Sequence, residues 1–217
     1  MTKLTGRQIA DEGLTGWVLL ANSLNTRIHS RDFATGLALV DAIGAAAEEA
    51  NHHPDIDLRY PYVDIRLVSH DTGGVTERDV RMARTISALA AEAGLTQTVS
   101  GVSELELALD TPALKDVLPF WAAVMAMERA PGPDIGDEVR DPSGRLPLIW
   151  FQESGREEPR QRWHPDVWVD PAEVQPRIEA AIAAGGALVS DAAAPSFWVL
   201  ADPEGNKVCL CTWQSRE

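Results

Sequence analysis

Three of the five histidines of this 217-residue chain lie between residues 48 and 79. His52 and His53 are adjacent, His70 follows, and carboxylates stand before and after them at Glu48 and Asp79. The imidazole side chain, with an unperturbed pKa of about 6.5, can give or take a proton near neutral pH. The residue types in this segment therefore indicate proton-transfer chemistry.

A helix is expected to deliver the adjacent histidines. Ser30 or Asp32 can cap its start, and Pro54 disfavours the α-region at the residue before it, so the helix should end near Asn51 or His52. Glu48 then lies one turn before His52 on the same face. The apolar positions that recur at helical spacing are Phe33, Leu37, Val40, Gly44 and Ala47.

His70 is expected at the end of a strand that spans residues 60 to 70. Val63, Ile65 and Leu67 alternate onto one face of this strand, and His70 belongs to the other face. Thr76 and Asp79 then form a capping box that opens the next helix. With an early helix over residues 5–13 and two strands over 17–20 and 26–30, the pattern predicts an α+β fold with an antiparallel sheet packed by helices.

Each member of this cluster also has a purely structural explanation. Asp79 could serve only as a cap, Glu48 could be a solvated carboxylate, and His70 could be a half-buried surface residue. The histidine pair could simply suit the negative end of a helix dipole. A metal site is not expected here, because adjacent side chains at a helix exit diverge and no cysteine or third well-spaced carboxylate completes a tetrahedral set.

Composition restricts the possible partners. Nineteen basic and thirty-three acidic residues give a formal charge of −14, which repels nucleic acid and anionic membranes. No apolar signal core and no stretch of ~18 apolar residues is present, so a cytoplasmic protein is expected. Cys209 and Cys211 lie two apart on an expected strand, too close in sequence to staple a domain, and are expected to be reduced.

Two domains are expected, over residues 1–97 and 102–217, separated by the small polar segment TQTVSG. The second half reads as a strand, a helix and several strands, and then repeats this order. The sequence therefore predicts paired βαβββ modules that arose by internal duplication.

The first half resembles the pterin-4a-carbinolamine dehydratase family over about residues 3 to 95. The residues that carry the resemblance are Glu48, His52-His53-Pro54, Tyr60, His70 and Asp79, with flanks Gly16-Trp17, Arg31-Asp32-Phe33 and Thr76-Glu77-Arg78-Asp79. The resemblance implies dehydration of a 4a-hydroxytetrahydropterin, such as tetrahydrobiopterin 4a-carbinolamine, to a quinonoid dihydropterin. It implies no metal and no other cofactor.

The residue chemistry suits this reaction, which needs an acid for the departing hydroxyl and a base for the neighbouring ring nitrogen. We expect His52 and His70 to share these roles, with the assignment left open, and His53 to position the substrate. Glu48 and Asp79 would orient the imidazoles. Candidates for substrate binding are Pro54, which would fix the backbone so that both histidines face the pocket; Tyr60 and Trp17, which could line the flat pterin or simply pack; and Arg78, which could steer the substrate or be a solvated charge.

A non-catalytic role is the alternative, because the resemblance also implies members that serve as dimerisation partners. The first domain could then be chiefly an interaction module, and a homo-oligomer is expected in either case. The intact histidine pattern favours the enzyme, since scaffolding alone needs no proton-transfer groups at these spacings.

The second half resembles the glyoxalase and bleomycin-resistance superfamily over about residues 102 to 214, through FWAAVM, RWHPDVWVD and DPEGNKVCL. By position, the resemblance maps the metal ligands of that superfamily to Glu106, Gln152, His164 and Cys209. Only His164 keeps its usual type, and an amide and a thiol in place of two carboxylates weaken a hard-cation site. A metal-free ligand-binding or structural module is expected, although carboxylate, imidazole and thiolate together form a possible zinc set that could act on its own.

Overall fold

The computed structural model describes residues 2–129, 137–155, 161–203 and 205–216. The chain divides into two compact units. The first comprises Met1–Val102 together with Thr212–Glu217, and the second comprises Ser103–Cys211. Among the described helices, none combines the length and the apolar character needed to cross a membrane.

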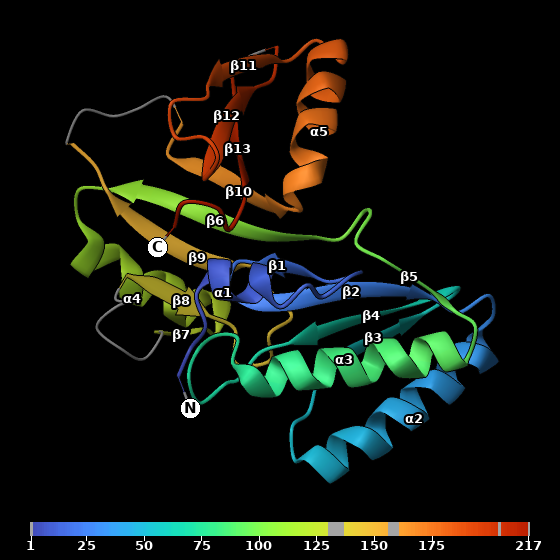
Figure 1. Ribbon diagram of the computed structural model, residues 1–217. Coiled ribbons are helices and arrows are strands. Elements are labelled where there is room, and N and C mark those ends of the chain that lie inside the picture. Colours follow the sequence, from blue (N-terminus) through green and yellow to red (C-terminus); the bar gives the residue numbers. More distant parts are fainter. Residues whose placement is uncertain (1, 130–136, 156–160, 204, 217) are drawn as a thin grey trace. The chain divides into compact units, whose positions relative to one another are not determined.

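The first unit is an antiparallel sheet with α2 and α3 on one face (Figure 1). Its strands pair in the order β1-β2-β4-β3, and β5 also pairs with β2. The predicted α+β class is confirmed. The elements are α1 Gly6–Asp11, β1 Val18–Leu20, β2 Ser23–His29, α2 Phe33–Ala50, β3 Asp55–Arg59, β4 Tyr62–Leu67, α3 Glu77–Glu92 and β5 Thr96–Thr98.

Each helix of this unit begins after a capping side chain, and for α2 this is Asp32 rather than Ser30. Thr5 forms a capping box with Gln8 at α1, and Thr76 forms one with Asp79 at α3. The Asp32 carboxylate accepts from the amide of Thr35 at the start of α2, and this hydrogen bond lowers the pKa of Asp32. Such side-chain oxygens satisfy amides that have no partner inside the helix.

The buried face of α2 agrees only in part with the apolar positions read from the sequence. Ala47 is buried and Val40 packs against the core, as expected. Phe33 and Leu37 are 51% and 47% exposed. Because most residues of α2 are small or apolar, several stripes have helical spacing and periodicity alone does not choose among them. The residues that α2 buries are Gly36, Leu39, Ile43 and Ala47.

One predicted strand is in fact a hairpin. The expected strand over residues 60 to 70 is limited to β4, and β3 pairs with it from Arg59↔Tyr62 to Asp55↔Arg66. The alternation along β4 is confirmed, with Val63, Ile65 and Leu67 buried in the core. β3 was not predicted from the sequence, because it has no buried apolar face. It is an edge strand in which three of the five side chains are exposed and the other two are half-buried.

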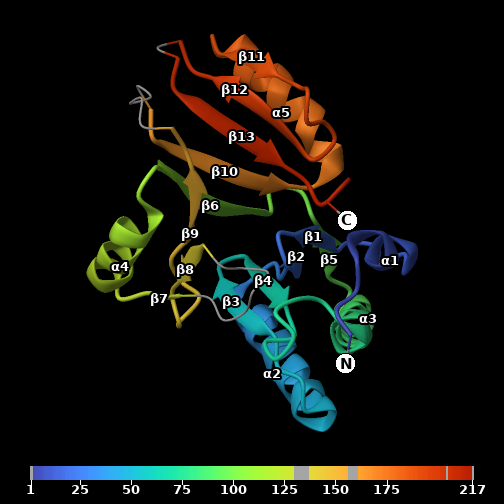
Figure 2. The same cartoon turned by 90° about the vertical axis from the view of Figure 1, so that its left-hand side faces the viewer.

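The second unit contains the two predicted βαβββ modules, joined into one eight-stranded sheet with the order β11-β12-β13-β10-β6-β9-β8-β7. Figure 2 shows α5 lying against the strands of its own module. The first module is β6 Ser103–Thr111, α4 Leu114–Met125, β7 Glu128–Arg129, β8 Glu138–Arg140 and β9 Leu148–Glu153. The second is β10 Trp163–Val169, α5 Pro171–Ala183, β11 Ala187–Ser190, β12 Phe197–Ala201 and β13 Lys207–Cys211.

The two faces of this sheet have different characters. Alternate residues of the central strands pack with the helices into two apolar clusters, which include Leu109, Ile149 and Val169. Because side chains alternate along a strand, the intervening residues belong to the opposite face. These intervening residues include Glu106, Asp110, Trp150, His164, Asp166, Trp168 and Cys209.

Candidate functional site

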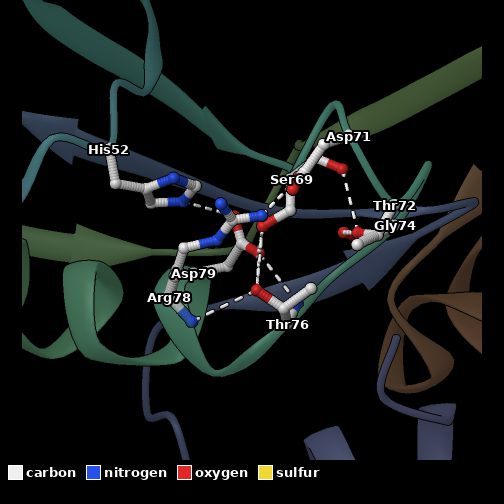
Figure 3. A network of polar contacts seen from close by, with 8 residues as sticks. All are labelled: His52, Ser69, Asp71, Thr72, Gly74, Thr76, Arg78 and Asp79. Atoms are coloured by element: carbon white, nitrogen blue, oxygen red, sulfur yellow. Dashed lines mark hydrogen bonds and ion pairs between the residues drawn. The ribbon is translucent and has the colours of Figure 1, made fainter. Parts of the chain in front are cut away.

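The candidate site of the first unit is built around a buried contact between His52 and Asp79. The Nε2 atom of His52 lies 2.7 Å from Oδ1 of Asp79 (Figure 3). His52 is 9% exposed and Asp79 is fully buried. Asn51 ends α2 in the left-handed conformation, and the amide of His52 still bonds to the Ala47 carbonyl, which turns the imidazole inward.

Three further donors hold the other oxygen of Asp79. Its Oδ2 atom accepts hydrogen bonds from the Ser69 hydroxyl at 2.7 Å, from the Thr76 amide at 2.7 Å and from the Thr76 hydroxyl at 3.2 Å. A carboxylate can only accept, so the Nε2 atom of His52 must donate. The other ring nitrogen, Nδ1, takes no part in this contact.

The adjacent histidine points elsewhere. The side chain of His53 is 54% exposed, and its Nε2 atom lies 3.0 Å from Oε1 of Glu48. Glu48 was expected to share a face with His52, but the structure pairs it with His53. The two histidines therefore diverge at the exit of α2, and Pro54 does not turn both toward one pocket as the sequence analysis expected.

His70 lies at the same end of the sheet as His52. Asp55, three residues after His52, pairs with Arg66, four residues before His70. His70 is exposed and directly follows Ser69, which binds Asp79. The β3–β4 hairpin thus brings the two histidines of the expected acid and base pair to one end of the first unit.

Arg78 forms an ion pair beside this network. Its guanidinium donates a hydrogen bond to Asp71, and this bond lowers the pKa of Asp71. The Nε atom of Arg78 is buried and has no hydrogen-bond partner among the described residues. The main-chain amide of Arg78 also donates to the Thr76 hydroxyl at 3.2 Å, so this cation adjoins the network (Figure 3).

The remaining predicted residues of the first unit are dispersed. Pro54 is half-buried just before β3. Tyr60 is 71% exposed at the opposite end of β3, ~17 Å along a five-residue strand. Trp17 is 8% exposed within the hydrophobic core, and its indole donates to the Ser87 hydroxyl at 2.9 Å. Tyr60 therefore lies apart from the His52–Asp79 contact, and Trp17 meets α3 at Ser87, about 12 Å along the helix from Asp79.

Two hydroxyls belong to the site although the sequence analysis gave them no role in it. Thr76 was recognised only as a cap, and Ser69 only as part of a strand. The signal for Thr76 was its capping box with Asp79, since a residue that caps through Asp79 must contact it. Nothing in the sequence singled out Ser69, which reaches Asp79 across the turn closed by the Ser69↔Gly74 bridge.

In the second unit, Glu106 is a half-buried acid on β6. Its Oε2 atom accepts a hydrogen bond of 2.8 Å from the Trp168 indole. Burial raises the pKa of Glu106 to about 7, and neighbouring carboxylates including Asp166 add to this effect, while the bond from Trp168 opposes it. Glu106 can therefore exchange a proton near neutral pH.

The other predicted ligands of the second unit are partly brought together. His164 and Cys209 form a group with Asp166, a residue that the sequence analysis missed, and one ligand atom from each lies within 4.8 Å of the others. Glu106 is not in this group, and Gln152 is exposed on β9. The hydrogen bond between His164 and Asp166 raises the pKa of His164.

Comparison with known proteins divides the chain in the same way. Residues 2–89 match the family model described as pterin 4 alpha carbinolamine dehydratase, and residues 106–211 match the one described as a glyoxalase-like domain. A protein of Acidobacterium capsulatum that is provisionally named a pterin-4-alpha-carbinolamine dehydratase is 42% identical over 91 residues. These residues are 41% of this chain and 99% of that protein.

Two solved structures each align with about half of the chain or slightly less. The transcriptional coactivator/pterin dehydratase from Brucella melitensis is 30% identical, with a TM-score of 0.40, over 41% of this chain and 99% of that one. A glyoxalase/bleomycin resistance protein/dioxygenase superfamily member from Vibrio splendidus is 13% identical, with a TM-score of 0.35, over 51% of this chain and 99% of that one.

Proposed function

The chain belongs to the pterin-4a-carbinolamine dehydratase family through its N-terminal domain, which a glyoxalase-like domain follows, and on this premise we propose that it dehydrates a 4a-hydroxytetrahydropterin. In this reaction the bond between C4a and the hydroxyl oxygen breaks, and the adjacent ring nitrogen loses its proton. A double bond forms between these two ring atoms, and water leaves. The product is the quinonoid dihydropterin.

We assign the base to His52. The observation that carries this assignment is the buried 2.7 Å contact between His52 Nε2 and Asp79 Oδ1. A carboxylate fixed behind an imidazole stabilises the imidazolium that forms when the opposite nitrogen accepts a proton. Nδ1 of His52 would thus take the proton from the ring nitrogen.

The acid is assigned to His70. It lies at the same end of the sheet as His52 and is exposed, so a substrate can reach it. Its imidazolium form would protonate the departing hydroxyl. His53, held by Glu48, and Arg78, held by Asp71, would position the pterin from either side. The proposal assigns no role in the reaction to Tyr60 or Trp17.

The test is stopped-flow dehydration of a freshly generated 4a-hydroxytetrahydropterin by the full chain. His52→Ala and His70→Ala should each slow the reaction by at least ~100-fold, the lower end of what a positioned acid or base contributes. His29→Ala is the matched control, because His29 is an exposed histidine at the end of β2 and should leave the rate unchanged. Rates near wild type in both site variants would reject the dehydratase proposal and favour the interaction module.

The proposal includes a second copy of the chain as a partner. Phe33 and Leu37 are half-exposed large apolar residues one turn apart on α2. Side chains of this kind are candidates for burial between two protein surfaces. A homo-oligomer formed through α2 is compatible with catalysis and also with the interaction module.

A further inference from the structure

The second unit contains three potential metal ligands that the proposed dehydration does not use. Asp166 of β10 is the direct partner of Cys209 in the parallel pairing of β10 with β13. His164 precedes Asp166 by two residues, so both side chains belong to one face of β10. An imidazole, a carboxylate and a thiol therefore meet on the sheet face opposite the apolar clusters.

The separations fit a single ion of zinc size. Nδ1 of His164 lies 3.1 Å from Oδ1 of Asp166, and ligand atoms of all three residues fall within 4.8 Å of one another. Two nitrogen or oxygen ligands at about 2.0 Å from a tetrahedral zinc ion are about 3.3 Å apart, and a sulfur ligand at about 2.3 Å lies slightly farther away. The three ligand atoms are therefore close enough together to approach one ion.

Neighbouring residues contact Asp166 and His164 and fix the orientation of both side chains. The Trp150 indole donates to Oδ2 of Asp166 at 3.0 Å, and its ring lies edge-on to the imidazole of His164. Nε2 of His164 faces Oδ1 of Asp110 at 3.9 Å. This Asp110 atom is buried and has no hydrogen-bond partner among the described residues. A carboxylate behind the distal ring nitrogen is the usual outer partner of a metal-bound histidine.

We propose that His164, Asp166 and Cys209 bind one Zn²⁺ ion, with Asp110 orienting His164. This set differs from the one that the glyoxalase resemblance implies, since Glu106 and Gln152 are replaced by Asp166. Thiolate, imidazole and carboxylate together suit zinc rather than a hard cation such as Mg²⁺. With three protein ligands, a fourth position is left for water or a small ligand.

The test is titration of the metal-free full chain with Co²⁺, which reports on sulfur ligation independently of any activity. Wild type should bind one equivalent and show an intense near-ultraviolet band from thiolate-to-cobalt charge transfer, and Zn²⁺ should displace the cobalt. Cys209→Ser should abolish the band. Cys211→Ser is the matched control, because it removes the other thiol of β13, which lies outside the group, and should keep the band.

Substitutions of the two carboxylates distinguish binding at this site from adventitious binding of metal to a cysteine alone. Asp166→Asn should weaken zinc binding by at least ~100-fold, and Asp110→Asn by about 10-fold, the lower range for an outer partner. Circular dichroism should show both variants folded. Absence of the band in wild type, or a band that survives Cys209→Ser, would overturn the proposal, as would unchanged zinc affinity in folded Asp166→Asn.

Discussion

Oδ1 of Asp79 and Nε2 of His52 are 2.7 Å apart although 27 residues separate them in the chain. The contact joins the exit of α2 to the first turn of α3, where Asp79 also completes the capping box with Thr76. One carboxylate therefore stabilises a helix start and fixes a histidine. Stability and proton transfer should respond together when it is changed.

Replacement of Asp79 by Asn should lower both the rate of dehydration and the free energy of unfolding. An amide cannot accept from all of the donors that now converge on the carboxylate, so buried donors lose partners at about 1 to 3 kcal/mol. We expect a 10- to 100-fold lower kcat, about the loss of a well-placed orienting group. Stopped-flow kinetics and urea denaturation measure the two effects.

A control separates orientation from general damage to the fold. In a double-mutant cycle of Asp79→Asn with His52→Ala, the effects on kcat should be strongly non-additive, because the carboxylate acts through the imidazole. Additive effects would mean that Asp79 only stabilises the domain.

Trp17→Phe should reduce stability without slowing the reaction. The change removes the hydrogen bond from the indole to Ser87, worth about 1 kcal/mol, and leaves a smaller ring in the core. We expect a total loss of about 1 to 3 kcal/mol in denaturant unfolding, with kcat/KM within about twofold of wild type. A loss of kcat/KM beyond 10-fold in a folded variant would instead restore Trp17 to the pterin site.

Glu106 should make the stability of the protein fall as pH rises through neutrality. Its pKa is about 7 in the folded protein against 4.5 ordinarily, so between these values the folded state binds more protons than the unfolded state. The contribution is present below about pH 4.5 and is lost as pH rises through about 7. It amounts to at most about 3 kcal/mol.

Unfolding measured at about pH 5 and about pH 8 tests this prediction. Glu106→Gln should remove the corresponding part of the decline in stability, whereas Glu153→Gln, which changes an exposed carboxylate of β9, should leave it in place. An identical pH dependence in wild type and Glu106→Gln would show that Glu106 titrates normally.

A charge on the exposed stripe of α2 should break the proposed homo-oligomer. Leu37→Glu places a carboxylate on a surface that would be buried between chains, which is strongly unfavourable. Light scattering should then give the 23.6 kDa mass of one chain, where wild type gives a multiple. Ile182→Glu on α5 is the control, since Ile182 is 48% exposed and should not alter the mass. A monomeric wild type would reject the proposed homo-oligomer.

Local signals predicted the helices of the first unit well. Thr5, Asp32 and Thr76 are short-range caps, and each one marks a helix start in the structure. The buried face of α2 was not predictable in the same way. The helix carries small and apolar residues on all of its sides. Packing against the sheet therefore determines that Leu39 and Ile43 face inward.

The sites depended more on long-range contacts. The pairing of His52 with Asp79 follows from where α2 ends and α3 begins, which the caps indicate. The separate pairing of His53 with Glu48 depends on the left-handed turn at Asn51, which carried no recognised signal. Asp166 was missed because its contact with Cys209 arises from a parallel strand pairing, although its spacing from His164 already predicted a shared face.

Thr212–Glu217 belongs to the first unit although it follows the second unit in the chain. This affects how the protein folds during synthesis and where it can be truncated. A methyl group added at Gly6 would lie 2.8 Å from the ring of Trp213, so Trp213 packs directly on the start of α1. The ribosome must therefore synthesise the whole glyoxalase-like unit before the dehydratase unit acquires its last side chains. A protease fragment or a gene truncated after residue 102 would give a dehydratase domain with an uncovered patch beside its first helix.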